Sequence, residues 1–132
     1  MVLKMNDLSL VRNVIKSAAK SNVLFKNKTY LQAIFISAEL GNLANLNYFI
    51  KHVEVDFSEI KHRDLSKDKA IEFNYNLAIN HAINGDQLET IKFLVSNAPC
   101  KILFDDHIKC SIRDNKTELV EYFNTISSKN IQ

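Results

Sequence analysis

The chain has only two glycines in 132 residues, and both stand in the same recurring phrase. Gly41 and Gly85 each follow an alanine three residues earlier, and each precedes an amphipathic helical pattern. A glycine between two helical patterns is best explained by a positive φ, which glycine adopts without a clash of a Cβ and which lets the next helix turn back. The sequence therefore predicts a helix-turn-helix unit that is used more than once.

Asparagine also tolerates the left-handed region, and it marks two weaker copies of the phrase at Asn6 and Asn115. The turn positions 6, 41, 85 and 115 are separated by 35, 44 and 30 residues. Spacings close to about 33 residues are typical of a repeat array, here with an insertion in its middle. We expect one domain, with units over approximately 1–26, 27–65, 66–100 and 101–132.

The phrase Ala-x-x-Gly-x-Leu-x-x-Val-x-x-Leu-Leu resembles the second half of an ankyrin repeat, and residues 85–97 match it best, with one extra residue before Leu88. The Thr-Pro-Leu-His signature of that family is absent. The resemblance implies an all-α fold, a short solenoid of about three to four degenerate ankyrin-like repeats. It also implies a protein–protein interaction module that binds a partner protein through its concave face.

By this resemblance, the partner faces the two residues before each turn position and the residue that enters each first helix. Those positions are Glu39, Leu40, Ile83, Asn84, Arg113 and Asp114, together with Leu31, Tyr75 and Asp105. Aromatic residues and arginine dominate interface energies, so we expect Tyr75 and Arg113 to be the hot spots. Tyr75→Ala and Arg113→Ala should each weaken binding by about 1 to 3 kcal/mol without unfolding the domain.

Capping residues and apolar periodicity set the expected helix boundaries. A capping box at Thr29 and Gln32 starts one helix, Ser66 starts a long one, and Asp86 starts the helix after the second turn. Asp105 or Asp106 caps the final pair. The expected helices cover 6–20, 29–40, 43–51, 66 to the turn at 85, 86–96, and a last pair that ends near 127.

The insertion between residues 52 and 70 carries the mixed-charge run Lys61-His62-Arg63-Asp64. Two interpretations remain open: a solvated surface loop, or a projection that is specific for a partner. His81 also has two interpretations, because it either packs between repeats or points toward the partner.

Enzymatic chemistry is not expected, because the chain lacks a glycine-rich phosphate loop, a Gly-x-Ser-x-Gly elbow and a His-Glu-x-x-His pair. We expect no cofactor and no metal. Cys100, His107 and Cys110 form the nearest approach to a metal-ligand pattern, and a small enzyme or metal-dependent module around them is the alternative. Packing of the cysteines in the core is favoured over that alternative.

A net charge of +2, spread along the chain, predicts no nucleic-acid or membrane partner. The only local basic cluster, around residues 61–69, is interrupted by aspartates. No signal peptide is expected at the start, and two cysteines are too few for a disulfide framework, so we expect a cytoplasmic monomer. A composition that suggests an AT-rich genome favours an effector of an intracellular bacterium or a virus, acting on a protein in the host-cell cytosol. A scaffold domain of a larger protein is a further alternative.

Overall fold

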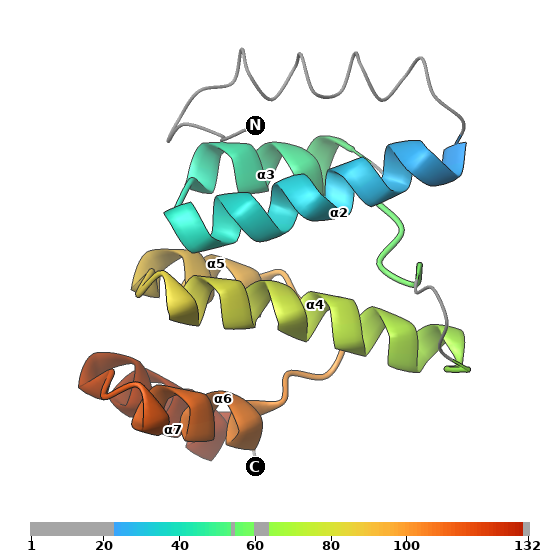
Figure 1. Ribbon diagram of the computed structural model, residues 1–132. Helices are drawn as coiled ribbons and strands as arrows, with labels where there is room; N and C mark the ends of the chain where they lie inside the picture. The colour runs from blue at the N-terminus through green and yellow to red at the C-terminus, as the bar shows by residue number, and fades with distance from the viewer. Residues whose placement is uncertain (1–22, 54, 60–63, 131–132) are drawn as a thin grey trace.

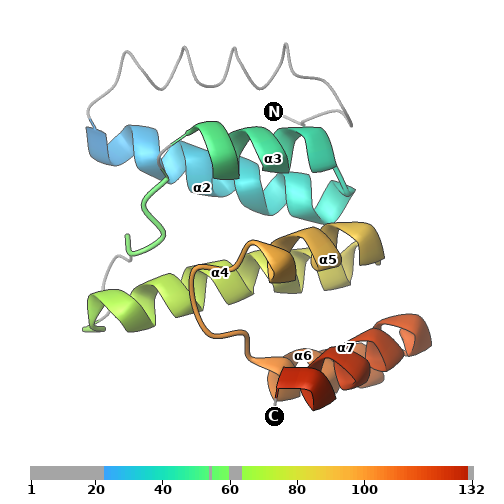
Figure 2. The same ribbon diagram turned by 180° about the vertical axis from the view of Figure 1, so that it is seen from behind.

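In the residues that the structure describes, helical hairpins are stacked in layers, as Figure 1 and the reverse view in Figure 2 show. The computed structural model describes residues 23–53, 55–59 and 64–130, so the helix and turn expected around 6–20 lie outside the described residues. The layers pair α2 with α3, α4 with α5 and α6 with α7. The helices are α2 (Val23–Leu40), α3 (Leu43–His52), α4 (Lys67–Asn84), α5 (Leu88–Ser96), α6 (Phe104–Arg113) and α7 (Thr117–Asn130). The expected all-α class is confirmed for the described residues, which contain no strand.

All three hairpins turn through the same backbone geometry. The left-handed residues are Gly41 (φ 73°), Asp86 (φ 56°) and Asn115 (φ 59°). In each turn the next residue donates its backbone N–H to the carbonyl five residues earlier, at 2.8 to 2.9 Å. The left-handed residue donates to the carbonyl three residues earlier, which completes a Schellman motif. The predicted turns at 41 and 115 are therefore confirmed.

The sequence predicts a positive φ at Gly85, and this prediction is wrong. Gly85 has φ −85°, and the positive φ falls on Asp86, which the sequence assigned as a helix cap. Gly85 instead permits a close approach between layers. A Cβ placed on it would overlap the carbonyl oxygen of Glu39 in α2 and lie 2.8 Å from the carbonyl carbon. Glycine is required here by the neighbouring backbone and not by the local turn.

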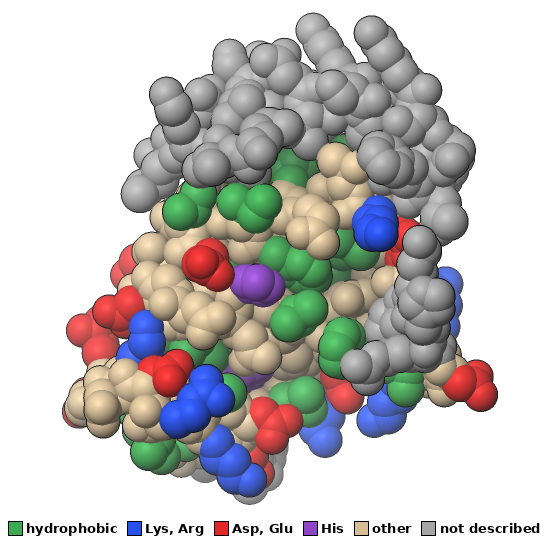
Figure 3. Space-filling view, viewed as in Figure 1, with side chains coloured by type: hydrophobic (Ala, Val, Ile, Leu, Met, Phe, Trp, Pro, Cys, Tyr) green, Lys and Arg blue, Asp and Glu red, His purple; other side chains and the backbone are tan. Residues whose placement is uncertain are grey.

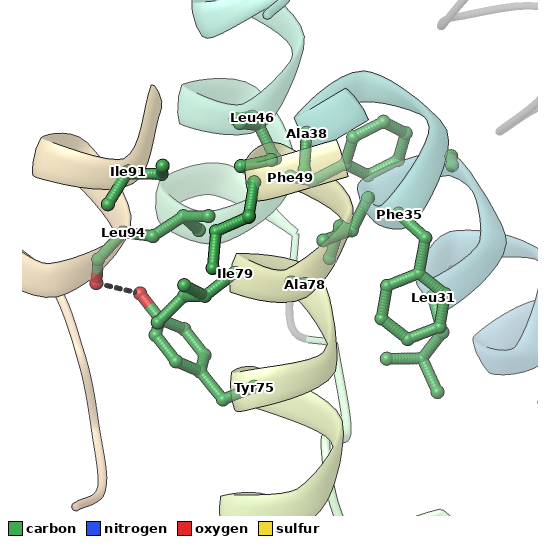
Figure 4. Close-up of a cluster of buried hydrophobic side chains, with 14 of the residues drawn as sticks. Leu31, Phe35, Ala38, Leu46, Phe49, Tyr75, Ala78, Ile79, Ile91 and Leu94 are labelled. Carbon is green, nitrogen blue, oxygen red and sulfur yellow. Dashed lines mark hydrogen bonds between the residues drawn. The ribbon is translucent and has the colours of Figure 1, made fainter. Parts of the chain in front are cut away.

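The core runs through the stack. Each layer contributes an apolar side chain that lies the same number of residues after its turn. Phe49, Leu94 and Phe123 each lie eight residues after the left-handed residue, and all three are fully buried. Figure 4 shows part of this core between the first two layers. Tyr75 lies inside it and donates its hydroxyl hydrogen to the carbonyl of Leu94. Burial raises the pKa of Tyr75, so this hydroxyl keeps its proton.

Several expected boundaries differ from the structure. The second expected helix begins at Val23 and not at Thr29, so Thr29 is not its cap. Ser66 does cap α4, accepting a hydrogen bond from the backbone of Lys69 at 3.3 Å. α6 begins at Phe104, which places both expected aspartate caps inside its first turn, and α7 ends three residues later than the expected end near 127.

Part of the insertion is held against two layers by asparagines. Asn27 of α2 accepts a hydrogen bond from the backbone of Asp56 at 2.7 Å and donates to its carbonyl at 2.9 Å. Asn74 of α4 donates to the carbonyls of Phe57 and Glu59 at 2.7 and 3.0 Å. Residues 55–59 are thus tied to the scaffold, whereas the charged run at 61–63 lies outside the described residues.

Within the described ranges, none of the helices combines the length and the apolar character that a membrane span requires.

Candidate functional site

The first helices of the three hairpins, α2, α4 and α6, lie on one side of the stack (Figure 1), and the second helices lie on the other (Figure 2). Positions counted back from each left-handed residue identify the outward side chains. Glu39, Asn84 and Arg113 stand two residues before their turns, and all three are exposed. We call the outward surface the first-helix face. It comprises Gln32, Ile36, Glu39, Phe73, Leu77, His81, Asn84, Asp106, Cys110 and Arg113.

This face mixes apolar and ionisable side chains. Ile36 and Leu77 are partly buried against the core, and Phe73 is 39% exposed. In the space-filling view, hydrophobic side chains lie scattered among polar ones, and charged side chains gather over the end of the third layer (Figure 3). Apolar and polar side chains are therefore interspersed over the face.

His81 joins the first two layers at the centre of the face. Its Nδ1 lies 3.1 Å from Oε1 of Glu39, and its ring stacks on Phe35 with centroids 5.2 Å apart. The ring is one-third exposed and the carboxylate is half exposed. The ring therefore packs between the layers while its edge reaches the surface, and its contact with a partner stays a prediction. The pair can donate or accept hydrogen bonds toward an approaching molecule.

Arg113 and Asp114 form the corresponding edge of the third layer. Nε of Arg113 lies 3.1 Å from Oδ1 of Asp114, and both side chains reach solvent. Hydrogen bonding from Arg113 lowers the pKa of Asp114, and the same contact raises the pKa of Arg113, so both stay charged. A hollow of about 460 Å³ lies beside them, lined in part by Asp86, Asp114, Lys116 and Glu118.

Three of the expected partner-binding residues lie in the core. Tyr75 and Ile83 are each 1% exposed and Leu31 is 6% exposed, so the assignment of these three to a surface was wrong. Leu31 and Tyr75 were expected to enter their helices. α2 and α4 are 18 residues long, which puts both residues inside a helix and turned toward the neighbouring layer. Ile83 was misplaced because the turn residue is Asp86 and not Gly85.

The other expected residues remain accessible. Glu39, Asn84, Asp105, Arg113 and Asp114 are exposed, and Leu40 is partly buried. The sequence analysis did not assign Ile36, Phe73 and Leu77 to this face. They fall five, nine or thirteen residues before a left-handed residue, and that register would have identified them once Asp86 had been recognised as the turn.

The alternative trio of metal ligands does not form a site. Both ring nitrogens of His107 face asparagine side chains, Nε2 at 2.9 Å from Asn76 and Nδ1 at 3.1 Å from Asn80. Burial, followed by the charge of Glu72, raises the pKa of the Cys100 thiol, which disfavours the thiolate that a metal or a nucleophile needs. In the part of the chain that the structure describes, no three His, Cys, Asp or Glu side chains are grouped to hold an ion.

Comparison with protein-family models, with curated proteins and with solved structures found no match for this chain.

Proposed function

We propose that this chain is an ankyrin-like solenoid that binds a protein partner across the first-helix face. The observation that carries the proposal is the alignment of Glu39, Asn84 and Arg113 at equivalent, exposed positions of three stacked hairpins. In repeat proteins, such stacking creates an extended surface that a single globular helix pair cannot offer.

The chemistry of the face supports a protein partner. Phe73, Leu77 and Ile36 supply apolar area, while the Glu39–His81 pair and Arg113 supply polar and charged groups on the same face. Energetic anchors at protein interfaces are typically aromatic side chains or arginines surrounded by weaker contacts. Phe73 and Arg113 have that character, and Phe73 takes the role that the sequence analysis assigned to the buried Tyr75.

The turn edge of the face is held by hydrogen bonds between layers. Gln87 Nε2 donates to the carbonyl of Glu39 at 3.3 Å, and Lys116 Nζ donates to the carbonyl of Asn84 at 3.3 Å. Both donors stand one residue after a left-handed turn residue, so the same contact recurs at both junctions. A surface fixed before binding loses less conformational entropy when a partner docks.

Charge reversal tests the proposal. The double variant Glu39→Arg, Arg113→Glu keeps the net charge and alters exposed positions only. Immobilised wild-type protein is used to capture partners from cell lysate, and the affinity of each captured protein is then measured by calorimetry. We expect the double variant to lose about 1 to 3 kcal/mol of binding free energy.

The matched control is Lys92→Glu, Glu121→Arg, which reverses two exposed charges on the second helices α5 and α7 and also keeps the net charge. Circular dichroism melting confirms that both variants fold. A partner that the control variant loses and the first variant retains would place the binding surface on the second helices and contradict the proposal.

A further inference from the structure

A polar cluster joins the third layer to the second. His107 of α6 is 1% exposed, and its ring lies between Asn76 and Asn80 of α4 and the ring of Phe123 of α7, with ring centroids 5.5 Å apart. The cluster is part of the contact between α4 and α6. An ionisable ring thus lies at the centre of a junction between layers.

The hydrogen bonds of Asn76 fix the proton on this ring. Its Nδ2 donates to the carbonyls of Glu72 and Lys101 at 2.7 and 3.0 Å, and its Oδ1 accepts from the backbone of Leu103 at 3.0 Å. Oδ1 therefore accepts from Nε2–H of the neutral ring, and Nδ1 carries the lone pair. Nδ1 lies 3.1 Å from Oδ1 of Asn80. The amide of Asn80 is partly exposed, and exchanging its oxygen and nitrogen lets it donate to Nδ1 of the neutral ring, whereas Oδ1 accepts from the protonated ring.

Protonation of His107 consequently keeps both hydrogen bonds and adds an uncompensated positive charge. Asp106 on α6 is the one charged group of the described residues that acts on the ring, and it is exposed. α4 offers two neutral amides, and its nearby Glu72 is paired with Lys69 at 3.6 Å. α7 offers Phe123 and the neutral Tyr122. Burial outweighs Asp106 and lowers the pKa of His107 to about 4.

We propose that the α6–α7 hairpin is an acid-released layer. Protonation of His107 separates α6 from α4 while α2 to α5 remain folded. Asn76 also holds the connecting segment through Lys101 and Leu103, so one amide of α4 ties both α6 and its connection to the second layer. Among the described residues, the junction between α2 and α4 has no buried histidine, because His81 there is one-third exposed and lies beside Glu39.

The direction of the pH dependence follows from linkage. The ring binds a proton less readily in the attached layer than in an open one, where its pKa returns to the ordinary 6.5. Attachment is therefore fully stable at neutral pH and weakens as the pH falls from 6.5 toward 4. If the proposed function holds, release removes Asp106, Cys110 and Arg113 from the first-helix face, and partner affinity falls with it.

Hydrogen exchange of the full chain at pH 7.5 and pH 4.5, corrected for the intrinsic exchange rate, tests release without a partner. Between these pH values we expect the opening equilibrium of α6 and α7 amides to increase on the order of fifty-fold, relative to amides of α2 to α5 in the same molecule. His107→Gln keeps a donor for Asn76 and takes up no proton, so it should remove the increase. His81→Gln is the matched control and should leave it.

Nuclear magnetic resonance titration of the His107 ring provides a second measurement that does not depend on how well His107→Gln folds. We expect the ring in the folded wild type to titrate below pH 5. Three results would overturn the proposal: a ring that titrates near pH 6.5 in an attached layer, equal protection of all layers at pH 4.5, or release that persists in His107→Gln. The charge-reversal variants of the first-helix face test partner binding at neutral pH, and a negative result there would leave the test of acid release unchanged.

Discussion

The two junctions of the stack use the same turn geometry and different chemistry. The α2–α4 junction brings backbone close to backbone at Gly85, with apolar side chains such as Ile34 and Ala78 fully buried beside it. The α4–α6 junction instead places Asn76 and His107 where the first junction has hydrocarbon. The turn therefore determines how each hairpin is built, whereas the residues between hairpins determine how firmly the layers hold together and under which conditions.

The third layer also shares its turn with the other two and differs from them in the side chains around it. Three residues before their left-handed residue stand Ala38, Ile83 and Ile112. The first two are fully buried because a following layer covers them, while Ile112 is 58% exposed. Ten and six residues before the left-handed Asn115, α6 carries Asp105 and Lys109, which are exposed and polar. The third layer thus repeats the turn but carries exposed side chains at these positions.

The largest effect is expected from adding a side chain where the backbones of α2 and α4 approach each other. Gly85→Ala places a Cβ against the carbonyl of Glu39, which is backbone and cannot rotate away. The layers must move apart, and we expect the free energy of unfolding to fall by about 3 kcal/mol. Urea denaturation followed by circular dichroism measures it.

Gly41→Ala is the matched control for that prediction. Its Cβ would meet the side chain of Gln87, with Cδ at 2.5 Å, and this side chain can rotate away. The remaining cost is the positive φ of 73°, about 1 to 2 kcal/mol. Adding Gln87→Ala should recover part of the loss for Gly41→Ala and none for Gly85→Ala. Equal losses at the two glycines, both relieved by Gln87→Ala, would show that backbone contact does not govern this junction.

The sequence was sufficient for the hairpins, because their signals are local. Gly41, Asn115 and the cap at Ser66 each act within a few residues of themselves, and the structure confirms all three. Gly85 shows the limit of such reasoning. Its requirement comes from Glu39, 46 positions earlier in the chain (85 − 39), and a local pattern cannot distinguish a glycine needed for φ from one needed for contact.

The candidate site was less predictable for the same reason. A surface position depends on which helix face the next layer covers, and an error of one residue in the turn moved the expected site from an exposed residue to the buried Ile83. Tyr75 appeared to be an anchor because aromatic residues are frequent both in interfaces and in cores. Its burial, with 1% of the residue exposed, and its contact with Leu94 place it in the core. Because α2 begins at Val23 and not at the expected Thr29, Leu31 lies inside the helix and not near its start.

A smaller effect, of opposite sign, is expected inside the first layer. Asn45 is fully buried on α3, and neither its amide nitrogen nor its oxygen has a hydrogen-bond partner in the described structure. The equivalent residue of the third layer, four positions after the turn, is the buried Leu119. Asn45→Leu keeps a similarly branched shape and removes two unsatisfied polar atoms. We expect the free energy of unfolding to rise by about 1 to 2 kcal/mol.

Asn42→Leu is the control for this substitution, three residues away. Oδ1 of Asn42 caps α3 by accepting from the backbone of Asn45 at 3.1 Å, so its removal should destabilise the protein by about 1 kcal/mol. Thermal melting of the two variants should therefore move the midpoint in opposite directions. A fall for both would mean that the buried amide of Asn45 is satisfied in solution and that the first layer, like the junction at His107, depends on polar contacts.

The smallest effect is expected from the hydrogen bond that recurs at both junctions. The geometry is the same at the two junctions, so a difference between them reports the charge of the donor. Gln87 and Lys116 reach equivalent carbonyls at the same distance of 3.3 Å, but only Lys116 brings a full charge to the end of a helix, where the dipole attracts it. Each substitution by alanine should cost about 0.5 to 1 kcal/mol in dilute buffer. In about 1 M salt, screening should reduce the cost of Lys116→Ala and leave that of Gln87→Ala unchanged. If salt changed neither cost, the charge of Lys116 would contribute nothing, and the difference between the two junctions would lie in the contacts at Gly85, Asn76 and His107.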